Sequence, residues 1–228
     1  MKKLIFAIMA LVSMSCAVNA GEIQESWCGD ESLSYCITHF DRQCSAKNYI
    51  ACGIVGDLHY EQKQDSESKK YYELVCDKAN SKDSYQVELI NGGLSNKVPA
   101  IKTMGFACGD LAKQYFNGWG VRQDKSKALQ YHKKACGLGY AVSCASAGVS
   151  YRLGEGTKKD FKLAKSYYEK SCEMQFGLGC FGLGVMYHGG KSVPQNLSKA
   201  KELYGKACDL GEQKGCDEYK ELNERGVR

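Results

Sequence analysis

Cysteines recur along this chain at a fixed interval, and this regularity constrains the fold more than any other feature. One series, 36 residues apart, consists of Cys108, Cys144, Cys180 and Cys216, and a second with the same interval consists of Cys136, Cys172 and Cys208. The two series are offset by eight residues. A sequence period of tens of residues is typical of stacked structural repeats. Such stacks usually offer binding surfaces, so the period also favours a binding function.

The first twenty residues have the pattern of a secretory signal. A lysine pair precedes an apolar run from Leu4 to Val12, and Ala20 ends a small-residue cleavage motif. We therefore expect cleavage after Ala20 and a secreted or periplasmic protein. A lipoprotein would use Cys16, but Ser13 stands where an aliphatic residue is usual. No later stretch has the roughly 18 apolar residues of a membrane span, so we expect none.

The composition of the processed chain favours a disulfide framework. Cleavage removes Cys16 and leaves 12 of the 13 cysteines, an even number. In an exported protein such a number indicates paired cysteines. The formal net charge falls from +5 to +3 because two lysines are lost with the signal. This mild excess, without a cluster of Lys or Arg, does not favour a nucleic-acid partner.

Each unit is predicted to begin with a helix whose buried face contains the opening cysteine. An apolar residue stands three positions after this cysteine, a small residue four positions after it, and an aromatic side chain seven positions after it. This spacing marks one face of a helix. These aromatic residues are His59, Tyr115, Tyr151 and Tyr187. Glycines then predict the end of the helix, because they accept the left-handed conformation of a helix stop. They are Gly118 and Gly120, Gly154 and Gly156, and Gly189 and Gly190.

A second helix is predicted to complete each unit. Its N-cap candidates are Asp124, Asp160 and Asn196. Alanine recurs inside it at 128, 164 and 200, and Tyr71, Tyr131, Tyr167 and Leu203 lie five residues before the closing cysteine. Most tyrosines occupy such repeated positions, so we interpret them as core residues. Leu33 to Cys44 has the features of a second helix too. Each unit is therefore a helix–turn–helix.

The closing cysteine of one unit and the opening cysteine of the next flank a short turn. Antiparallel helices joined in this way bring two Cα atoms to the roughly 5.5 Å that a disulfide needs. The predicted pairs are Cys28–Cys36, Cys44–Cys52, Cys76–Cys108, Cys136–Cys144, Cys172–Cys180 and Cys208–Cys216. Cys76 and Cys108 are paired because they are the two cysteines left once the other pairs are assigned. The pairing of Cys28 with Cys36 stays open.

The predicted organisation follows from this alignment. It comprises a signal peptide at 1–20, a degenerate N-terminal helical unit at 21–52, a divergent repeat at 53–107 with an insertion at 79–98, repeats at 108–143, 144–179 and 180–215, and a C-terminal capping helix at 216–228. The insertion contains a short β-like run from Tyr85 to Ile90. It is the least regular part of the chain, and its role stays open.

The motif Gly118-Trp119-Gly120-Val121-Arg122-Gln123-Asp124, followed by Lys127-Ala128 and Tyr131, resembles the Sel-one-like repeat, a relative of the tetratricopeptide repeat. Cysteines at eight-residue spacing resemble those of the secreted Helicobacter cysteine-rich proteins. The likeness covers roughly Cys44 to Glu224. It implies an all-α fold, a right-handed α/α superhelical solenoid of disulfide-stapled helix–turn–helix repeats. It also implies action mainly through protein contacts on a concave surface.

Members of the cysteine-rich group have also been credited with penicillin binding or weak β-lactamase activity. A serine β-lactamase needs Ser-x-x-Lys together with Ser-Asp-Asn and Lys-Thr-Gly elements. Ser66 with Lys69 and Ser198 with Lys201 have the first spacing, as often as chance predicts, and the other two elements do not occur. We therefore expect no catalytic residue in this chain.

Neither a metal nor a cofactor is predicted. The histidines His39, His59, His132 and His188 are scattered, and two of them occupy aromatic repeat positions. No two cysteines of the processed chain lie closer than eight residues, whereas zinc sites favour Cys-x₂₋₄-Cys. The glycines lack the Gly-Lys-Ser/Thr sequence of a phosphate-binding loop.

In tetratricopeptide-type stacks the inner face of the first helix binds ligands, and the resemblance implies the same face here. The corresponding residues are Asp57, Tyr60, Phe106, Lys113, Phe116, Asn117, Val149, Arg152, Phe181, Val185 and His188. These aromatic and charged side chains suit an extended peptide or a partner helix. We therefore expect a monomeric, exported module that binds an unidentified protein or peptide. The alternative is a protein that binds a cell-wall peptide or β-lactam, with weak amide hydrolysis.

Overall fold

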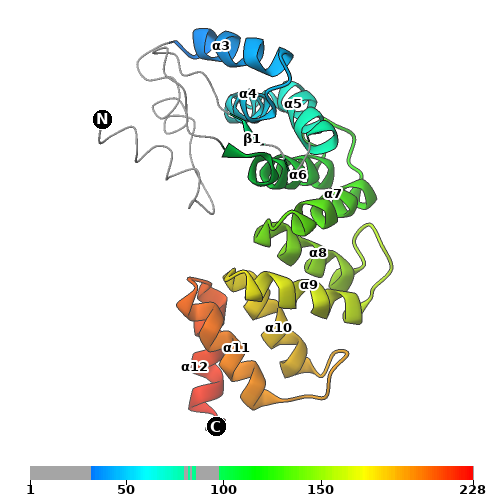
Figure 1. Ribbon diagram of the computed structural model, residues 1–228. Coiled ribbons are helices and arrows are strands. Elements are labelled where there is room, and N and C mark those ends of the chain that lie inside the picture. The colour runs from blue at the N-terminus through cyan, green and yellow to red at the C-terminus, as the bar shows by residue number, and fades with distance from the viewer. Residues whose placement is uncertain (1–31, 80–81, 83, 86–97, 228) are drawn as a thin grey trace, which may run out of the picture. The chain divides into compact units, whose positions relative to one another are not determined.

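The computed structural model describes residues 32–79, 82, 84–85 and 98–227. Within this part of the chain, ten α-helices and two strands of two residues follow one another (Figure 1). The helices are α3 (Leu33–Ser45), α4 (Tyr49–Glu61), α5 (Asp65–Lys78), α6 (Ala100–Asn117), α7 (Lys125–Gly137), α8 (Ala141–Leu153), α9 (Phe161–Glu173), α10 (Gly177–Gly189), α11 (Leu197–Asp209) and α12 (Gln213–Glu224). The predicted all-α class is confirmed.

One strand lies within the predicted insertion at 79–98 and the other at its end. β1 (Ser84–Tyr85) pairs antiparallel with β2 (Val98–Pro99), so that Ser84 faces Pro99 and Tyr85 faces Val98. The expected β-like run contributes Tyr85 to β1, and its remainder lies outside the described residues. The predicted signal peptide at 1–20 lies outside them as well.

The chain divides into two compact units, Met1–Gln123 and Asp124–Arg228. In the first unit α3 packs on α4, α4 on α5 and α5 on α6, and α4 also contacts α6. In the second unit the helices from α7 to α12 pack in sequence, and α8 contacts α10. Packing on sequence neighbours, with contact between the first helices of successive repeats, is the arrangement of an α/α solenoid.

The polar residues predicted as N-caps begin the second helices. The Asp124 carboxylate accepts a hydrogen bond from Lys127 N at 2.9 Å, and Asn196 Oδ1 accepts one from Lys199 N at 2.8 Å. Asp160 caps α9 in the same way, accepting from two backbone amides at 2.9 Å each. A capping side chain stabilises a helix by about 1 kcal/mol because it satisfies amides that have no partner in the first turn.

Left-handed residues end the first helices, with one correction to the sequence alignment. Gly118, Gly154 and Gly190 have φ of 79°, 79° and 61°. The second left-handed position is filled by Gly120, Gly156 and, in the last repeat, Ser192 at φ 63°. The pair Gly189 and Gly190 is displaced by one residue: Gly189 is the last residue of α10, and Gly190 is the left-handed C-cap.

The buried aromatic position lies one residue later than the sequence pattern indicated. The residues four positions before each closing cysteine are Phe40, Tyr72, His132, Tyr168 and Tyr204, all buried. Five positions before the cysteine, Tyr71, Tyr131 and Tyr167 are only partly buried, and Leu203 alone of that set is buried. Rings at the buried position pack against glycines of the first helices. A Cβ on Gly148 would lie 2.7 Å from the Tyr168 ring, and one on Gly184 would lie 2.7 Å from Tyr204.

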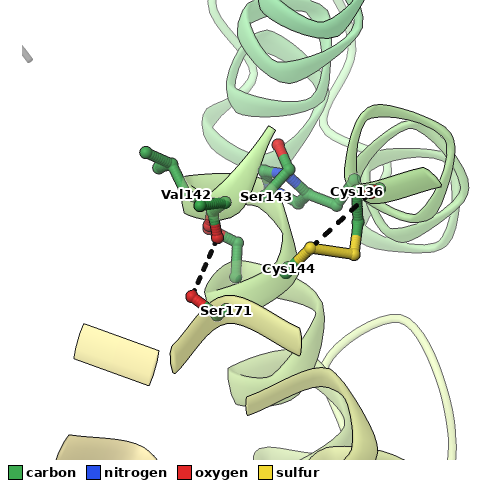
Figure 2. Close-up of a disulfide and its surroundings, with 8 residues drawn as sticks. Cys136, Val142, Ser143, Cys144 and Ser171 are labelled. Atoms are coloured by element: carbon green, nitrogen blue, oxygen red, sulfur yellow. Dashed lines mark hydrogen bonds between the residues drawn. A yellow bond between two sulfur atoms is a disulfide. The ribbon is translucent and has the colours of Figure 1, made fainter. Parts of the chain in front are cut away.

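Among the described residues, five disulfides each tie a helix that ends a unit to the first helix of the next unit. They are Cys44–Cys52, Cys76–Cys108, Cys136–Cys144, Cys172–Cys180 and Cys208–Cys216, with Cα separations of 4.5 to 5.1 Å. Cys36 is also disulfide-bonded, and its proposed partner Cys28 lies outside the described residues. Figure 2 shows Cys136–Cys144 and, nearby, the buried Ser171, whose hydroxyl donates to Ala141 O at 3.0 Å.

Candidate functional site

The predicted groove residues all lie on first helices. Asp57 and Tyr60 are on α4, Phe106, Lys113, Phe116 and Asn117 on α6, Val149 and Arg152 on α8, and Phe181, Val185 and His188 on α10. Asn117 is exposed and the other ten are partly exposed. The cysteines on the same helices, Cys52, Cys108, Cys144 and Cys180, are fully buried, so the predicted groove residues lie at more accessible positions of these helices.

Several of these residues meet around buried tyrosines, and three clusters result. Each contains one core tyrosine whose ring is buried and whose hydroxyl contacts a predicted groove residue. We name them by their tyrosines: the Tyr72 cluster in the first unit, and the Tyr168 and Tyr204 clusters in the second. The tyrosine hydroxyl fixes the polar end of a side chain that comes from the preceding first helix.

The Tyr72 cluster joins α4, α5 and α6. The Tyr72 hydroxyl donates to Asp57 Oδ1 at 2.9 Å, and the Tyr60 ring lies 6.4 Å from the Tyr72 ring. On α6, Lys113 Nζ lies 2.6 Å from Asp110 Oδ1. The structure thus brings together three predicted groove residues, Asp57, Tyr60 and Lys113.

The electrostatics of this cluster are unusual because two carboxylates lie near one another. Burial, with the nearby Asp110 carboxylate as the second cause, raises the pKa of Asp57 to about 7. Burial and the charge of Asp57 raise the pKa of Tyr72 well above its usual value. The tyrosine therefore stays a neutral donor, while Asp57 changes its charge near neutral pH.

The Tyr168 cluster joins α8, α9 and α10. Arg152 Nε donates to the Tyr168 hydroxyl at 3.2 Å. The ring of Tyr168 is 1% exposed and lies against Gly148 of α8 and Gly182 of α10. Burial raises the pKa of Tyr168, while the hydrogen bond from Arg152 acts in the opposite sense. Val149, one turn before Arg152, packs against the apolar core around this tyrosine.

The Tyr204 cluster joins α10, α11 and α12. His188 Nδ1 is hydrogen-bonded to the Tyr204 hydroxyl at 3.2 Å, and Glu218 Oε2 lies 3.7 Å from the same nitrogen. Burial raises the pKa of Tyr204, with Glu218 as the second cause. Phe181 packs on the Tyr204 ring at 5.6 Å, and Val185 packs against the same apolar cluster.

The remaining predicted residues lie at the end of α6 or along its length. Asn117 Nδ2 donates to Lys113 O at 3.0 Å, and the carbonyl of Phe116 accepts from Gln123 Nε2 at 2.7 Å. These contacts belong to the helix terminus. Phe106 is partly buried in the first half of α6.

Two acidic residues of the clusters were not predicted from the sequence. Asp110 and Glu218 occupy equivalent positions, two residues after the opening cysteines Cys108 and Cys216. Gly182 and Ser146 hold this position in the other two repeats. The signal that could have found them is the helical spacing, since this position faces the tyrosine of the preceding second helix.

Neither Ser-x-x-Lys pair has its lysine directed to the serine. Lys69 forms an ion pair with Glu73 at 3.4 Å. Lys201 donates to Asn223 Oδ1 at 2.9 Å and to Val227 O at 2.6 Å. A general base must reach the hydroxyl it deprotonates, and these lysines are engaged elsewhere.

Two further features are absent from the described residues. No group of three or more His, Cys, Asp or Glu side chains there is arranged to hold a metal ion. Over the same part of the chain, no helix combines the length and apolar character needed to span a membrane.

Helical hairpins that follow one another and pack on their sequence neighbours place the chain in the class of α/α repeat proteins. A family model described as Sel1 repeat matches residues 105–140, 141–176 and 177–212. The matched units have the length of the predicted repeats and begin three residues earlier. The chain belongs to the Sel1 repeat family.

Two solved structures are similar in sequence to about half of the chain. The chain is 30% identical to a Sel1 repeat protein from Oxalobacter formigenes, over 51% of this chain and 88% of that one, with a TM-score of 0.47. It is 31% identical to cysteine rich protein B of Helicobacter pylori, over 51% and 92%, with a TM-score of 0.42. No curated protein matches the chain.

A longer structure shares the fold over nearly the whole chain. It is c5321, a protective antigen of uropathogenic Escherichia coli strains displaying an SLR fold. It is 21% identical, has a TM-score of 0.71, and covers 98% of this chain. The chain spans 44% of that protein. The predicted solenoid is confirmed, and Sel1 repeats are a fold that supports protein interaction.

Proposed function

We propose that this protein is an exported module that binds a peptide segment of a partner protein along the first helices of its repeats. One observation carries the proposal: side chains on the first helices converge, partly exposed, on the hydroxyls of buried tyrosines. Such an arrangement presents positioned donors, acceptors and rings beside apolar side chains. Peptide-binding surfaces combine these features.

The disulfides support the exported part of the proposal. Several disulfides are consistent with a protein outside the cytoplasm, because reducing systems keep cytosolic thiols free. The signal-like pattern before Gly21 gives a route of export, with cleavage after Ala20. Retention in the periplasm and release from the cell are distinguished by following the processed chain in cell fractions.

A binding surface on α8 and α10 can be tested by photo-crosslinking in the exporting cell. A photoreactive phenylalanine analogue is placed at Phe181 or Val149 in the full chain, and at Leu163 as a control. Leu163 is 41% exposed on α9 and is not a predicted groove residue. We expect one partner adduct of the same mass from both groove positions, and its loss from the Val149 position when Phe181→Ala is added.

Two results would contradict the proposal. Equal labelling from Leu163 would show that the contacts are not specific to the first helices. Absence of an adduct from every position in the exporting cell would show that no partner binds this surface there.

The β-lactam alternative has no structural observation in its favour, since both Ser-x-x-Lys lysines are held by other partners.

A further inference from the structure

Arg152 differs from Lys113 and His188, the other basic side chains of the three clusters, because no ion pair with an acidic residue joins it in the described part of the chain. Its Nε contact is with the Tyr168 hydroxyl. The nearest acidic residues in sequence, Glu155 and Asp160, are engaged elsewhere: Glu155 pairs with Lys125 at 2.8 Å, and Asp160 caps α9 through two backbone amides. Further along α9, Glu169 pairs with Lys165 at 2.6 Å. A partly buried guanidinium therefore keeps terminal amino groups without a carboxylate.

The side chain of Arg152 is held in place by a rigid anchor. Tyr168 is 1% exposed, and a Cβ atom on Gly148 or Gly182 would lie 2.7 or 2.6 Å from its ring. The ring is thus fixed between two helices, and its hydroxyl has little freedom to move. Because that hydroxyl accepts the Nε hydrogen bond, the guanidinium is oriented before any ligand arrives, which reduces the entropic cost of binding.

The repeats themselves show what the Tyr168 cluster lacks. In the Tyr72 and Tyr204 clusters, the position two residues after the next opening cysteine supplies a carboxylate, Asp110 or Glu218. In the Tyr168 cluster this position is Gly182. The Tyr168 cluster, which contains Arg152, therefore lacks the carboxylate that the next repeat supplies to the other two clusters. In the Tyr204 cluster, by contrast, Glu218 lies 3.7 Å from His188.

We infer that Arg152 and the Tyr168 hydroxyl form a binding site for the carboxylate of an acidic side chain in the partner peptide. This inference rests on the proposed function and names the chemistry of its ligand. A guanidinium binds a carboxylate through two parallel hydrogen bonds, and such bonds are stronger than neutral ones. The Tyr168 hydroxyl accepts from Arg152, so its own proton is available for the same ligand.

The surroundings favour an acidic residue within a mixed peptide. Val149 lies one turn before Arg152 on the same helix and is partly exposed, so it can contact an apolar neighbour of the acidic residue. The second unit, residues 124–228, contains 18 Lys or Arg and 12 Asp or Glu. This positive excess favours association with an acidic segment.

The test uses the processed chain with its disulfides intact and three synthetic hexapeptides. The first alternates Val and Glu and has blocked ends, the second replaces Glu with Gln, and the third is the Gln peptide with a free C-terminal carboxylate. Binding is measured by fluorescence anisotropy, and the Nε–H resonance of Arg152 is followed by NMR. We expect the Glu peptide to shift this resonance and to bind at least ten times more tightly than either Gln peptide.

The Arg152→Gln variant should lose this tenfold preference, and Tyr168→Phe should lower it while leaving Arg152 in place. Arg225→Gln is the matched control, because Arg225 lies in the same unit and pairs with Glu221 at 3.4 Å. Thermal unfolding of each variant separates loss of binding from loss of fold.

Equal binding of Glu and Gln peptides, or an unchanged preference in Arg152→Gln, overturns the inference. An Arg152 Nε–H resonance that does not shift at millimolar Glu peptide also overturns the inference. Tight binding of the free C-terminus alone would assign the site to a chain end and reject an acidic side chain. Failure of this site with crosslinking intact at Phe181 would leave the proposed function standing.

Discussion

Gly182 lies so close to Tyr168 that a Cβ atom at this glycine would be 2.6 Å from Cε1 of the ring. The two residues belong to successive repeats, α10 and α9, and their contact sets the distance between those helices. Any side chain at 182 must displace the ring or the helix. The same ring also meets Gly148, where a Cβ atom would lie 2.7 Å from Cδ1 and Cε1, so two first helices crowd it.

Gly182→Ala should therefore destabilise the second unit. We expect a loss of about 1–3 kcal/mol in the free energy of unfolding, the usual cost of overpacking a core. Urea unfolding monitored by circular dichroism measures it. Gly137→Ala is the control, because a Cβ there has no neighbour within 4 Å and α7 continues to this residue. The control should leave stability unchanged or raise it by up to about 1 kcal/mol.

A second glycine pair separates backbone conformation from crowding. Gly139 and Gly156 both have positive φ, 87° and 69°. A Cβ at Gly139 has open space, whereas one at Gly156 would lie 2.2 Å from Lys125 O. Gly139→Ala should cost about 1–2 kcal/mol, from the left-handed conformation alone. Gly156→Ala should cost clearly more. Thermal and urea unfolding of both variants measure the two losses. Equal losses for Gly139→Ala and Gly156→Ala would contradict the expected clash at Gly156.

The pKa of Asp57 predicts how stability varies with pH. Because the folded-state pKa is raised to about 7, the folded chain holds a proton that the unfolded chain releases between pH 4 and 7. The free energy of unfolding therefore falls as the pH rises through this window, by up to about 1.4 kcal/mol per pH unit from this group. Above pH 7 the loss is complete.

Asp57→Asn should remove this dependence while keeping an oxygen that accepts from Tyr72. The wild type should lose stability relative to the variant between pH 4.5 and 7, and the difference should level off above pH 7. Urea unfolding at half-unit pH steps measures both curves. Parallel curves for the two proteins would show that Asp57 does not titrate in this range.

The disulfides differ in the size of the loop that they close. Cys172–Cys180 spans 8 residues and Cys76–Cys108 spans 32. On the chain-entropy model, loss of the larger loop should cost about 1 kcal/mol more than loss of the smaller one. Double Cys→Ala variants of each pair, unfolded in urea without reductant, test this order. The reverse order would show that local packing, and not chain entropy, decides the cost.

The sequence predicted the fold well because the period reports which residues face the core. The N-caps, the helix-ending glycines and the turn-flanking cysteines all depend on local backbone requirements, which a repeat displays several times. The buried aromatic position was assigned one residue too early. Two adjacent tyrosines, Tyr167 and Tyr168, lie on neighbouring parts of one helical face, and spacing alone does not show which ring meets the glycines.

The candidate site was less accessible from the sequence. Its first-helix residues followed from the repeat, but the roles of Asp110, Gly182 and Glu218 depend on contacts between successive repeats. Such contacts involve residues that are far apart along the chain or differ from one repeat to the next. In the repeat 108–143 the positions of the glycine–tyrosine pair are held by Ala112 and His132, a joint change that only the aligned repeats make visible.

The position of the disulfides decides how the protein tolerates nicking. A protease that cuts the turn at 138–140 leaves both fragments joined through Cys136–Cys144. A cut at 154–160, inside a repeat, is spanned by no described disulfide, so only packing would hold those fragments together. Every repeat is thus covalently secured at its borders and open to scission at its centre.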